Sequence, residues 1–259
     1  MNMYLINAFT QEEFKGNPAA IIILDDDKDE KWMASLAKQL NQPITTFALK
    51  KEDHFKLRWF TPTNEINLCG HGTLGASHIL WSEGYCDPKN PITYETLSGR
   101  LLADRCNGKI KLTFPIIPAT SIPILEGMNE VLNVPIKAMA WANNRYIVEV
   151  ENASVVYEIV PNFERMKELD GAGVIVTTCM SEKYDIVSRY FAPKIGINED
   201  SVTGSAHCAL ASYWKKHLKK NKWNAYQASE RGGKLLLNVG ADTVDIIGDC
   251  RTIAKGTIL

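Results

Sequence analysis

A sequence pattern occurs twice in this chain, and the repetition restricts the folds that the chain can adopt. The two segments are RWFTPTNEINLCGHGTLGASHILW and RYFAPKIGINEDSVTGSAHCALASYW, and each begins with arginine, an aromatic residue, phenylalanine, a variable residue and proline. Each then reaches a glycine-containing turn, LCGHGT or VTGSAH, followed by small and apolar residues up to Trp81 or Trp214. A later glycine turn, at Gly99 and Gly233, follows at a similar spacing. The pattern indicates an internal duplication; the alternative is a chance similarity of two amphipathic segments.

A proline-rich segment separates the two copies. FPIIPATSIP contains three prolines in ten residues, and proline breaks helices and removes donors from sheet ladders. A chain of 259 residues has room for two modest domains, since domains contain about 100–200 residues. We therefore predict an N-terminal half at 1–118 and a C-terminal half at 119–259, with the last strand free to cross back to the first half.

Strand-like runs alternate with fewer helical stretches in both halves. AAIIIL, HFKLRWF, IKLTF, GVIVTT and KLLLNV are typical of strands. DEKWMASLAKQL has apolar residues at helical spacing, and Asp29 can cap that helix. These patterns predict two halves of the α+β class.

The segments after the two glycine turns predict buried helices. TLGASHILW and SAHCALASYW are apolar nearly all round, and a helix of that character is buried on every side, as it would be inside a curved sheet. The glycines allow close approaches that a Cβ would block, so the unpaired amides of each first turn can form an anion site. The alternative is that the glycines serve only close packing. The expected ligand contacts are Gly70, Gly72 and Thr73 in the first copy and Thr203, Gly204 and Ala206 in the second.

Composition excludes several classes of function. The formal net charge is −1, so no chain-wide basic field attracts nucleic acid or an anionic membrane. No apolar run approaches the roughly 20 residues of a membrane span, and MNMYLINAFT is not expected to be a signal peptide. The six cysteines are dispersed without a C-x-x-C pair, which is typical of thiols in a reducing cytoplasm. The spacing of cysteines and histidines does not resemble a zinc site, and no dinucleotide or phosphate-loop motif is present.

Four blocks of the sequence resemble the phenazine-biosynthesis PhzF-like family. They are NAFTQEEFKGNPAA, RWFTPTNEINLCGHGTLGASHIL, SRYFAPKIGINEDSVTGSAHCALASYW and QASERGGKL, and together they span nearly the whole chain. The resemblance implies the diaminopimelate epimerase-like fold, with two pseudo-symmetric halves, each a curved mixed sheet around a central helix, and an active site between them. It also implies catalysis without a metal or cofactor. We expect a cytoplasmic homodimer that acts on a small carboxylated substrate.

The same resemblance implies three catalytic residues. His71 matches the histidine of the family's C-G-H turn, Asp200 the aspartate of E-D-P-V-T-G-S, and Ser205 its serine. For Asp200 a helix N-cap is the structural alternative, and for His71 a packed polar residue. The wider superfamily uses a pair of cysteine bases. Cys69 looks like the first of that pair, whereas Thr203 stands where the second would be.

One position departs from the family pattern. The family's main acid/base resembles a glutamate in an N-L-S-E-T-x-F segment, and here NQPITTF places Ile44 at that position. An isoleucine cannot accept or deliver a proton. Two hypotheses follow: a cofactor-independent isomerase that uses other residues, or a catalytically silent member that binds a metabolite or a partner protein.

Overall fold

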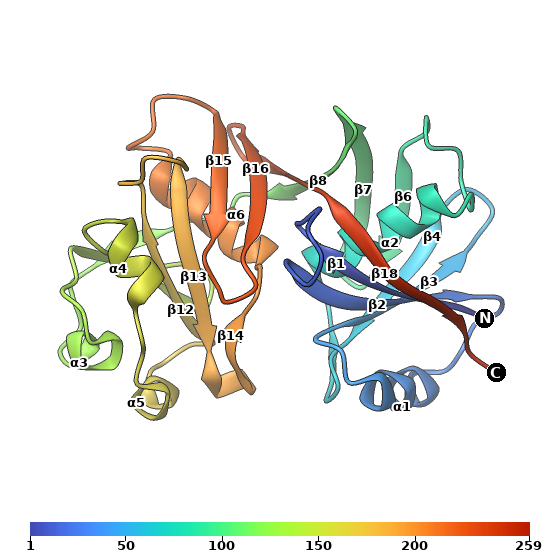
Figure 1. Ribbon diagram of the computed structural model, residues 1–259, viewed down its shortest axis with the longest axis horizontal. Coiled ribbons are helices and arrows are strands. Elements are labelled where there is room, and N and C mark those ends of the chain that lie inside the picture. The colour runs from blue at the N-terminus through green and yellow to red at the C-terminus, as the bar shows by residue number, and fades with distance from the viewer. The chain divides into compact units, whose positions relative to one another are not determined.

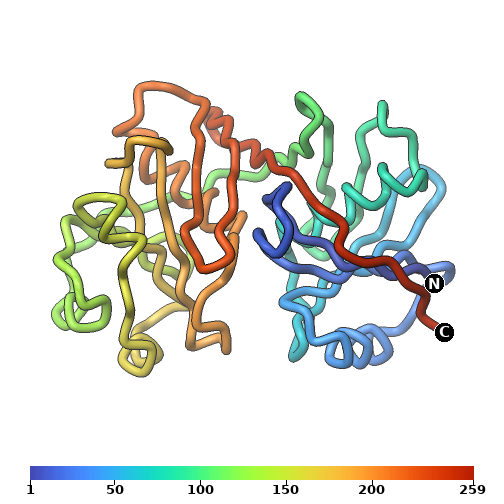
Figure 2. The backbone as a smooth tube through the Cα atoms, in the orientation of Figure 1, coloured from blue at the N-terminus to red at the C-terminus, as the bar shows by residue number.

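The computed structural model describes residues 1–259, which divide by their contacts into two units (Figure 1). Unit 1 comprises Met1–Thr113 and Ile247–Leu259, and unit 2 comprises Phe114–Ile246. In Figure 2 the last residues of the chain run beside its first strand, and the two termini lie close together in unit 1.

Unit 1 is a mixed sheet with two helices. Its strands are β1 (Asn2–Ala8), β2 (Asn17–Leu24), β3 (Thr45–Lys50), β4 (Phe55–Phe60), β5 (Glu65–Ile66), β6 (Ile92–Thr96), β7 (Gly99–Cys106), β8 (Lys109–Pro115) and β18 (Cys250–Thr257). β18 pairs antiparallel with β1, β1 with β2, β3 with β4, β4 with β5, β6 with β7 and β7 with β8. β2 and β3 are parallel, as are β4 and β6. The helices are α1 (Glu30–Leu40) and α2 (Gly70–Ser82).

Unit 2 has a second mixed sheet. Its strands are β9 (Thr120–Ile122), β10 (Ala138–Trp141), β11 (Arg145–Glu149), β12 (Gly173–Thr178), β13 (Ile186–Ala192), β14 (Ile197–Asp200), β15 (Lys222–Gln227), β16 (Gly233–Val239) and β17 (Thr243–Gly248). Its helices are α3 (Met128–Leu132), α4 (Ala153–Glu158), α5 (Phe163–Glu168) and α6 (Gly204–Trp214), with a 3₁₀ turn at Pro193–Ile195.

The two units repeat one pairing scheme. In unit 1 the chain forms an antiparallel pair β1–β2, the parallel pair β2–β3, the antiparallel pairs β3–β4 and β4–β5, and the parallel pair β4–β6. In unit 2 the same order of pairings joins β10, β11, β12, β13, β14 and β15. Because α2 follows β5 and α6 follows β14, the prediction of two similar α+β halves is confirmed.

The helices after the two glycine turns are buried, as their composition predicts. Nine of the 13 residues of α2 and eight of the 11 residues of α6 are buried. A Cβ at Gly75 would lie 2.8 Å from Ile6 Cδ1 and 3.0 Å from Ile21 Cδ1, so α2 packs directly on β1 and β2. Burial of the apolar side chains of such a helix is the main source of its stability, since neither end of α2 carries a charged residue in its terminal turn.

The surface helix α1 also forms where the sequence predicts it. Asp29 is its N-cap, and the Asp29 carboxylate accepts a hydrogen bond of 2.7 Å from the Trp32 amide. Met33 and Ala37 face the core and pack with Phe47 and Phe60 of β3 and β4. The helix therefore covers the face of this sheet opposite to α2.

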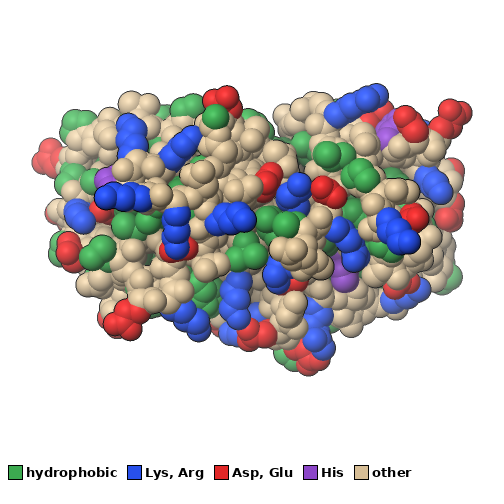
Figure 3. Space-filling view, turned by 90° about the horizontal axis from the view of Figure 1, so that it is seen from above, with side chains coloured by type: hydrophobic (Ala, Val, Ile, Leu, Met, Phe, Trp, Pro, Cys, Tyr) green, Lys and Arg blue, Asp and Glu red, His purple; other side chains and the backbone are tan.

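The charges of the surface are mixed. Acidic and basic side chains are interspersed over the face drawn in Figure 3, as expected for a net charge of −1. No helix has the length and apolar character needed to span a membrane.

Candidate active site

A cysteine and a histidine lie together at the start of α2. Cys69 is the N-cap of this helix, and its Sγ accepts a 3.4 Å hydrogen bond from the Gly72 amide. The Cys69 Sγ also lies 3.4 Å from His71 Nδ1. A thiol at a helix N-terminus beside an imidazole is in surroundings that favour reactivity, because both stabilise negative charge on sulfur. This pair can take up and release a proton.

Gly72 and Thr73, two of the predicted ligand contacts in this turn, face the interior of the unit. A Cβ at Gly72 would lie 2.5 Å from Thr46 Oγ1 and 2.9 Å from Trp59 Cδ1, so this glycine is required for close packing of the helix on β3 and β4. Thr73 is fully buried, and its hydroxyl and amide both donate to the Cys69 carbonyl, at 2.7 and 3.0 Å. The packing alternative therefore accounts for Gly72, and the Thr73 side chain holds the turn rather than facing a ligand.

Asp200 and Thr203 form the corresponding cluster at the start of α6. Thr203 is the N-cap residue, but its side chain caps no amide, because its hydroxyl donates to Asp200 Oδ2 at 2.5 Å. The N-cap alternative for Asp200 is thus wrong: Asp200 ends β14, and its carboxylate is held by the N-cap residue. A hydrogen bond from a hydroxyl to a carboxylate is charge-assisted and fixes the carboxylate strongly.

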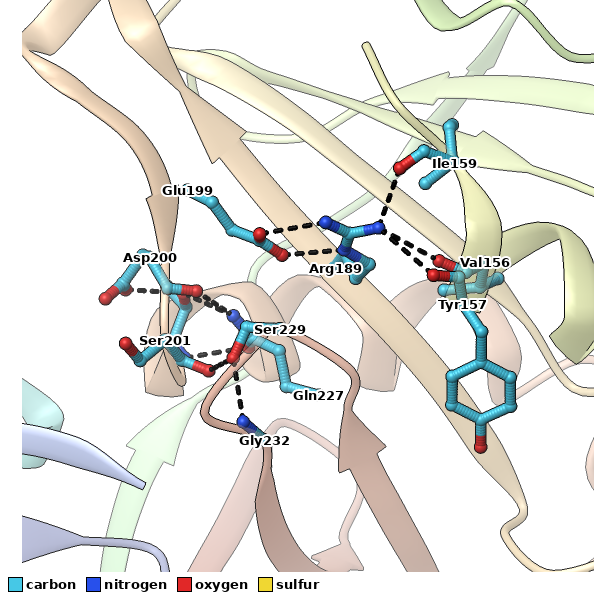
Figure 4. Close-up of polar contacts among 11 residues, drawn as sticks. Val156, Tyr157, Ile159, Arg189, Glu199, Asp200, Ser201, Gln227, Ser229 and Gly232 are labelled. Carbon is cyan, nitrogen blue, oxygen red and sulfur yellow. Dashed lines mark hydrogen bonds and ion pairs between the residues drawn. The ribbon is translucent and has the colours of Figure 1, made fainter. Parts of the chain in front are cut away.

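Gln227 also belongs to this cluster, although no sequence motif predicted a role for it. Its Oε1 accepts from the Thr203 amide at 2.8 Å. Its Nε2 donates to the Asp200 carbonyl at 2.7 Å (Figure 4). Gln227 is fully buried at the end of β15. A polar residue at the end of a strand, a few residues before the Gly232–Gly233 turn, was the signal that could have identified it.

Ser205, in the first turn of α6, has a basic partner. Arg145 Nη1 donates to Ser205 Oγ at 2.9 Å, and the guanidinium carbon of Arg145 lies 5.3 Å from the centre of the Tyr190 ring. Arg145 is the first residue of β11, about sixty positions before Ser205 in the sequence, so only the fold brings them together. Sequence patterns gave no signal for this arginine.

Each of the two motif arginines holds a glutamate. Arg58 binds Glu65 through two hydrogen bonds of 2.6 Å, and Arg189 binds Glu199 at 2.7 and 2.9 Å. Figure 4 shows Arg189 between Glu199 and the backbone carbonyls near Ile159. These bidentate pairs fix the short strands that precede α2 and α6, which is a structural role for the repeated motif.

Two buried groups of α6 are unsuited to acid–base work. Burial lowers the pKa of His207 to about 4, and its Nδ1 lies 2.8 Å from the Thr203 carbonyl, so the ring is neutral and donates to that carbonyl. Burial raises the pKa of the Cys208 thiol to about 12. Both residues are part of the core of unit 2.

Ile44, which the resemblance of NQPITTF to the family segment aligns with the glutamate, is also a core residue. It is 1% exposed, and its carbonyl accepts a 2.9 Å hydrogen bond from the Ala20 amide. Thr46, two residues further along, contacts the start of α2 through the close approach at Gly72. Ile44 lies directly before β3.

Comparison with known proteins places the chain in a family. The family model described as phenazine biosynthesis-like protein matches residues 6–256. An uncharacterized isomerase of Halalkalibacterium halodurans is 40% identical over 99% of this chain and 98% of its own length. An uncharacterized isomerase of Pseudomonas aeruginosa is 34% identical over 100% of this chain and 98% of its own length. The crystal structure of a PhzF-family phenazine biosynthesis protein from Enterococcus faecalis superposes with a TM-score of 0.95 at 38% identity, covering 100% of this chain and 99% of that one. The chain therefore belongs to the phenazine biosynthesis-like (PhzF) protein family.

Proposed function

We propose that this chain is a cofactor-independent isomerase that moves a proton within a small carboxylated metabolite. The observation that carries the proposal is the pair at the start of α2, where Cys69 Sγ lies 3.4 Å from His71 Nδ1. The Asp200–Thr203 pair at the start of α6 supports it, because each unit then contributes one acid–base cluster at the N-terminus of a buried helix. The isomerase names of two relatives agree with this class of reaction.

The proposed reaction needs no change of oxidation state. A C–H bond near the substrate carboxylate breaks, its electron pair delocalises into the adjacent unsaturated system, and the base holds the proton. The same proton, or one from solvent, then returns to a different carbon or to the other face. Because Ile44 has no ionisable group, we assign the base to the Cys69–His71 pair, which also returns the proton, and we assign the Asp200 carboxylate as a second proton acceptor.

The amides of the two helix starts are the proposed carboxylate contacts. Anions bind at helix N-termini because unpaired N–H groups and the helix dipole favour negative charge. The residues concerned are Gly70 in α2 and Gly204 and Ala206 in α6. The Gly72 and Thr203 amides are not included, because they already donate to Cys69 Sγ and to Gln227 Oε1. Substitutions at each helix start, made separately, test these contacts through the rate of deuterium exchange.

Solvent deuterium incorporation tests the proposed function without knowledge of the substrate. Purified protein is incubated in D₂O with an extract of small carboxylic acids, and mass spectrometry detects acids that gain deuterium. We expect one acid, or a few related acids, to gain deuterium at a rate proportional to the protein concentration. Cys69→Ser and His71→Gln should each reduce that rate at least about 100-fold, as is typical when an acid–base group is removed.

Cys86→Ser is the matched control, because Cys86 is a partly exposed thiol of the same unit. Its rate should equal that of the wild type. An extract in which no acid gains deuterium would contradict the isomerase proposal. Equal rates in the wild type and in Cys69→Ser and His71→Gln would instead move the base to another residue.

A catalytically silent protein is the second candidate, and Ile44 favours it. This side chain, which the resemblance aligns with the family's acid/base, has no ionisable group and is 1% exposed. A silent protein would bind small acids in the same extract, detectable by mass spectrometry of the co-purified fraction, without exchanging deuterium into them.

The remaining parts of the proposal concern assembly and location. We propose a homodimer in the cytoplasm, in line with six cysteines that are all thiols in the structure. Analytical ultracentrifugation of the purified chain tests the dimer, and fractionation of the source cells tests the location.

A further inference from the structure

Arg145 has a charge that its own unit does not neutralise. Its polar interactions are the hydrogen bond to Ser205 and the contact with the Tyr190 ring, and no carboxylate of unit 2 pairs with it. Its Nε atom is buried and has no hydrogen-bond acceptor. Arg189 of the same sheet, by contrast, has its Nε on Glu199 Oε1 at 2.7 Å. A half-buried guanidinium without a counter-charge is costly, which indicates that an anion completes the cluster.

The fold holds the Arg145 side chain in one place. Asn143 and Asn144 both have positive φ, at 42° and 69°, and form a tight two-residue turn closed by hydrogen bonds between Ala142 and Arg145. Arg145 is thereby fixed at the start of β11. Its guanidinium lies against the Tyr190 ring, which adds a cation–π attraction.

Gly173, which pairs with Arg145 in the parallel ladder, makes room for that ring. A Cβ at Gly173 would lie 2.3 Å from the Phe191 carbonyl oxygen and 3.0 Å from both Tyr190 Cε2 and the Tyr190 hydroxyl oxygen, so the glycine lets β13 and this ring approach closely. The arrangement of glycine, aromatic ring and guanidinium is thus specified by three separate strands, β11, β12 and β13.

The hydrogen bond between Arg145 and Ser205 has only one possible donor. A guanidinium is a donor and has no acceptor, so Ser205 Oγ must accept from Arg145 Nη1. The hydroxyl proton of Ser205 is therefore directed away from Arg145 and is available to an acceptor. Ser205 lies in the first turn of α6, where the helix dipole also favours a negative charge.

We infer that Arg145 binds the carboxylate of the substrate and orients Ser205 as a second donor to the same group. The ligand class is a planar carboxylate, because a guanidinium presents donors in a plane that matches one. This inference deepens the proposed function by naming the residues that recognise the acid. It assigns a binding role to Arg145 and a binding role, in place of a proton-transfer role, to Ser205.

Nitrogen-15 NMR of arginine side chains tests the inference directly. The Nε–H signal of Arg145, identified by its loss in Arg145→Lys, is followed while benzoate is added. Benzamide, which has the same shape without the charge, is added in a parallel titration. We expect a saturable shift of the Arg145 signal with benzoate and none with benzamide, whereas the Arg189 signal, already satisfied by Glu199, stays in place.

Calorimetry of variants measures the size of the effect. Arg145→Gln should raise the Kd for benzoate at least about tenfold, since a charge-assisted hydrogen bond contributes about 1.5–3 kcal/mol. Ser205→Ala should raise it about fivefold, and Arg165→Gln, which removes an exposed arginine of the same unit, should not change it. Thermal unfolding of each variant confirms that it is folded.

The outcomes separate this inference from the isomerase proposal. Benzoate binding that depends on Arg145, in a protein that exchanges no deuterium into any acid, supports the inference and overturns the isomerase. Deuterium exchange that is unchanged in Arg145→Gln, or an Arg145 signal that does not respond to benzoate, overturns the inference and leaves the isomerase proposal standing.

Discussion

The Thr203 hydroxyl donates to Asp200 Oδ2 across 2.5 Å, and this bond occupies the hydroxyl that would otherwise cap α6. An N-cap hydroxyl normally satisfies one of the first amides of its helix. Here the residue in the cap position instead fixes the carboxylate at the end of β14. The Gln227 side chain accepts from the Thr203 amide and donates to the Asp200 carbonyl. The orientation of Asp200 therefore depends on the buried side chains of Thr203 and Gln227.

Thr203→Val should release Asp200 while changing the helix little. Valine has the shape of threonine without the hydroxyl, and no cap bond is lost because the side chain makes none. We expect the deuterium-exchange rate to fall at least about tenfold, with the unfolding free energy lowered by about 1.5–3 kcal/mol for the lost charge-assisted bond. Thr203→Ser, which keeps the hydroxyl, should retain most of the rate. Equal rates in both variants would show that Asp200 needs no such support.

Much of the fold could be predicted from the sequence, because its determinants are local and repeated. The apolar composition of TLGASHILW and SAHCALASYW indicated burial, and both helices are buried. The cap at Asp29 was a local signal as well. Gln227 and Arg145 escaped prediction because each acquires its role from partners distant in the chain, which only the pairing of strands brings near.

The glycine turn illustrates a different limit. The sequence shows that Gly72 needs close approach, but it does not show to what. The structure gives the partner as Thr46 and Trp59, inside the unit. The sequence favours ligand approach and leaves close packing as the alternative, and for this residue the contacts with Thr46 and Trp59 support close packing.

Gly72→Ala should therefore destabilise the protein. The added Cβ would lie 2.5 Å from Thr46 Oγ1 and 2.9 Å from Trp59 Cδ1, and overpacking of this kind costs about 1–3 kcal/mol. Gly256→Ala is the control, because its Cβ would meet only Met3 Cε at an ordinary 3.6 Å. Urea denaturation of both variants gives the comparison, and equal midpoints would mean that α2 can shift to accept the methyl group.

The buried histidine of α6 should make stability dependent on pH. Burial lowers the pKa of His207 to about 4, below the value of about 6.5 in an unfolded chain. The unfolded state then binds more protons, so this contribution to stability is present above pH 6.5 and is lost as the pH falls toward 4. We expect a loss of the order of 3 kcal/mol across that range.

His207→Gln removes this titration and keeps a group able to donate to the Thr203 carbonyl. Its unfolding free energy should fall less steeply between pH 6.5 and 4 than that of the wild type, whatever its absolute value. Parallel slopes for the two proteins would show that His207 titrates normally. Direct observation of the His207 ring by NMR over the same range checks the cause.

Ile44 permits the sharpest test of catalysis. If the family reaction on a dihydroaromatic acid requires a carboxyl at this position, the wild type should exchange little or no deuterium into that acid. Ile44→Glu should increase the exchange, because a carboxyl in surroundings that leave Ile44 1% exposed would have a raised pKa, suited to donating and recovering a proton near neutral pH.

The gain should come with a loss of stability, since the new carboxyl group replaces a packed apolar side chain. We expect about 2–4 kcal/mol by urea denaturation, comparable to other insertions of polar groups into a core. Ile44→Gln is the matched control: it has the size and polarity of glutamate but no acid, so it should be destabilised similarly and stay inactive.

The rate in Ile44→Glu should still be below that of a native family enzyme, because Pro43 restricts the backbone before it and the neighbouring side chains are not arranged around an acid. Wild-type exchange as fast as that of Ile44→Glu would show that the Cys69–His71 pair or Asp200 performs the reaction without a carboxyl at this position.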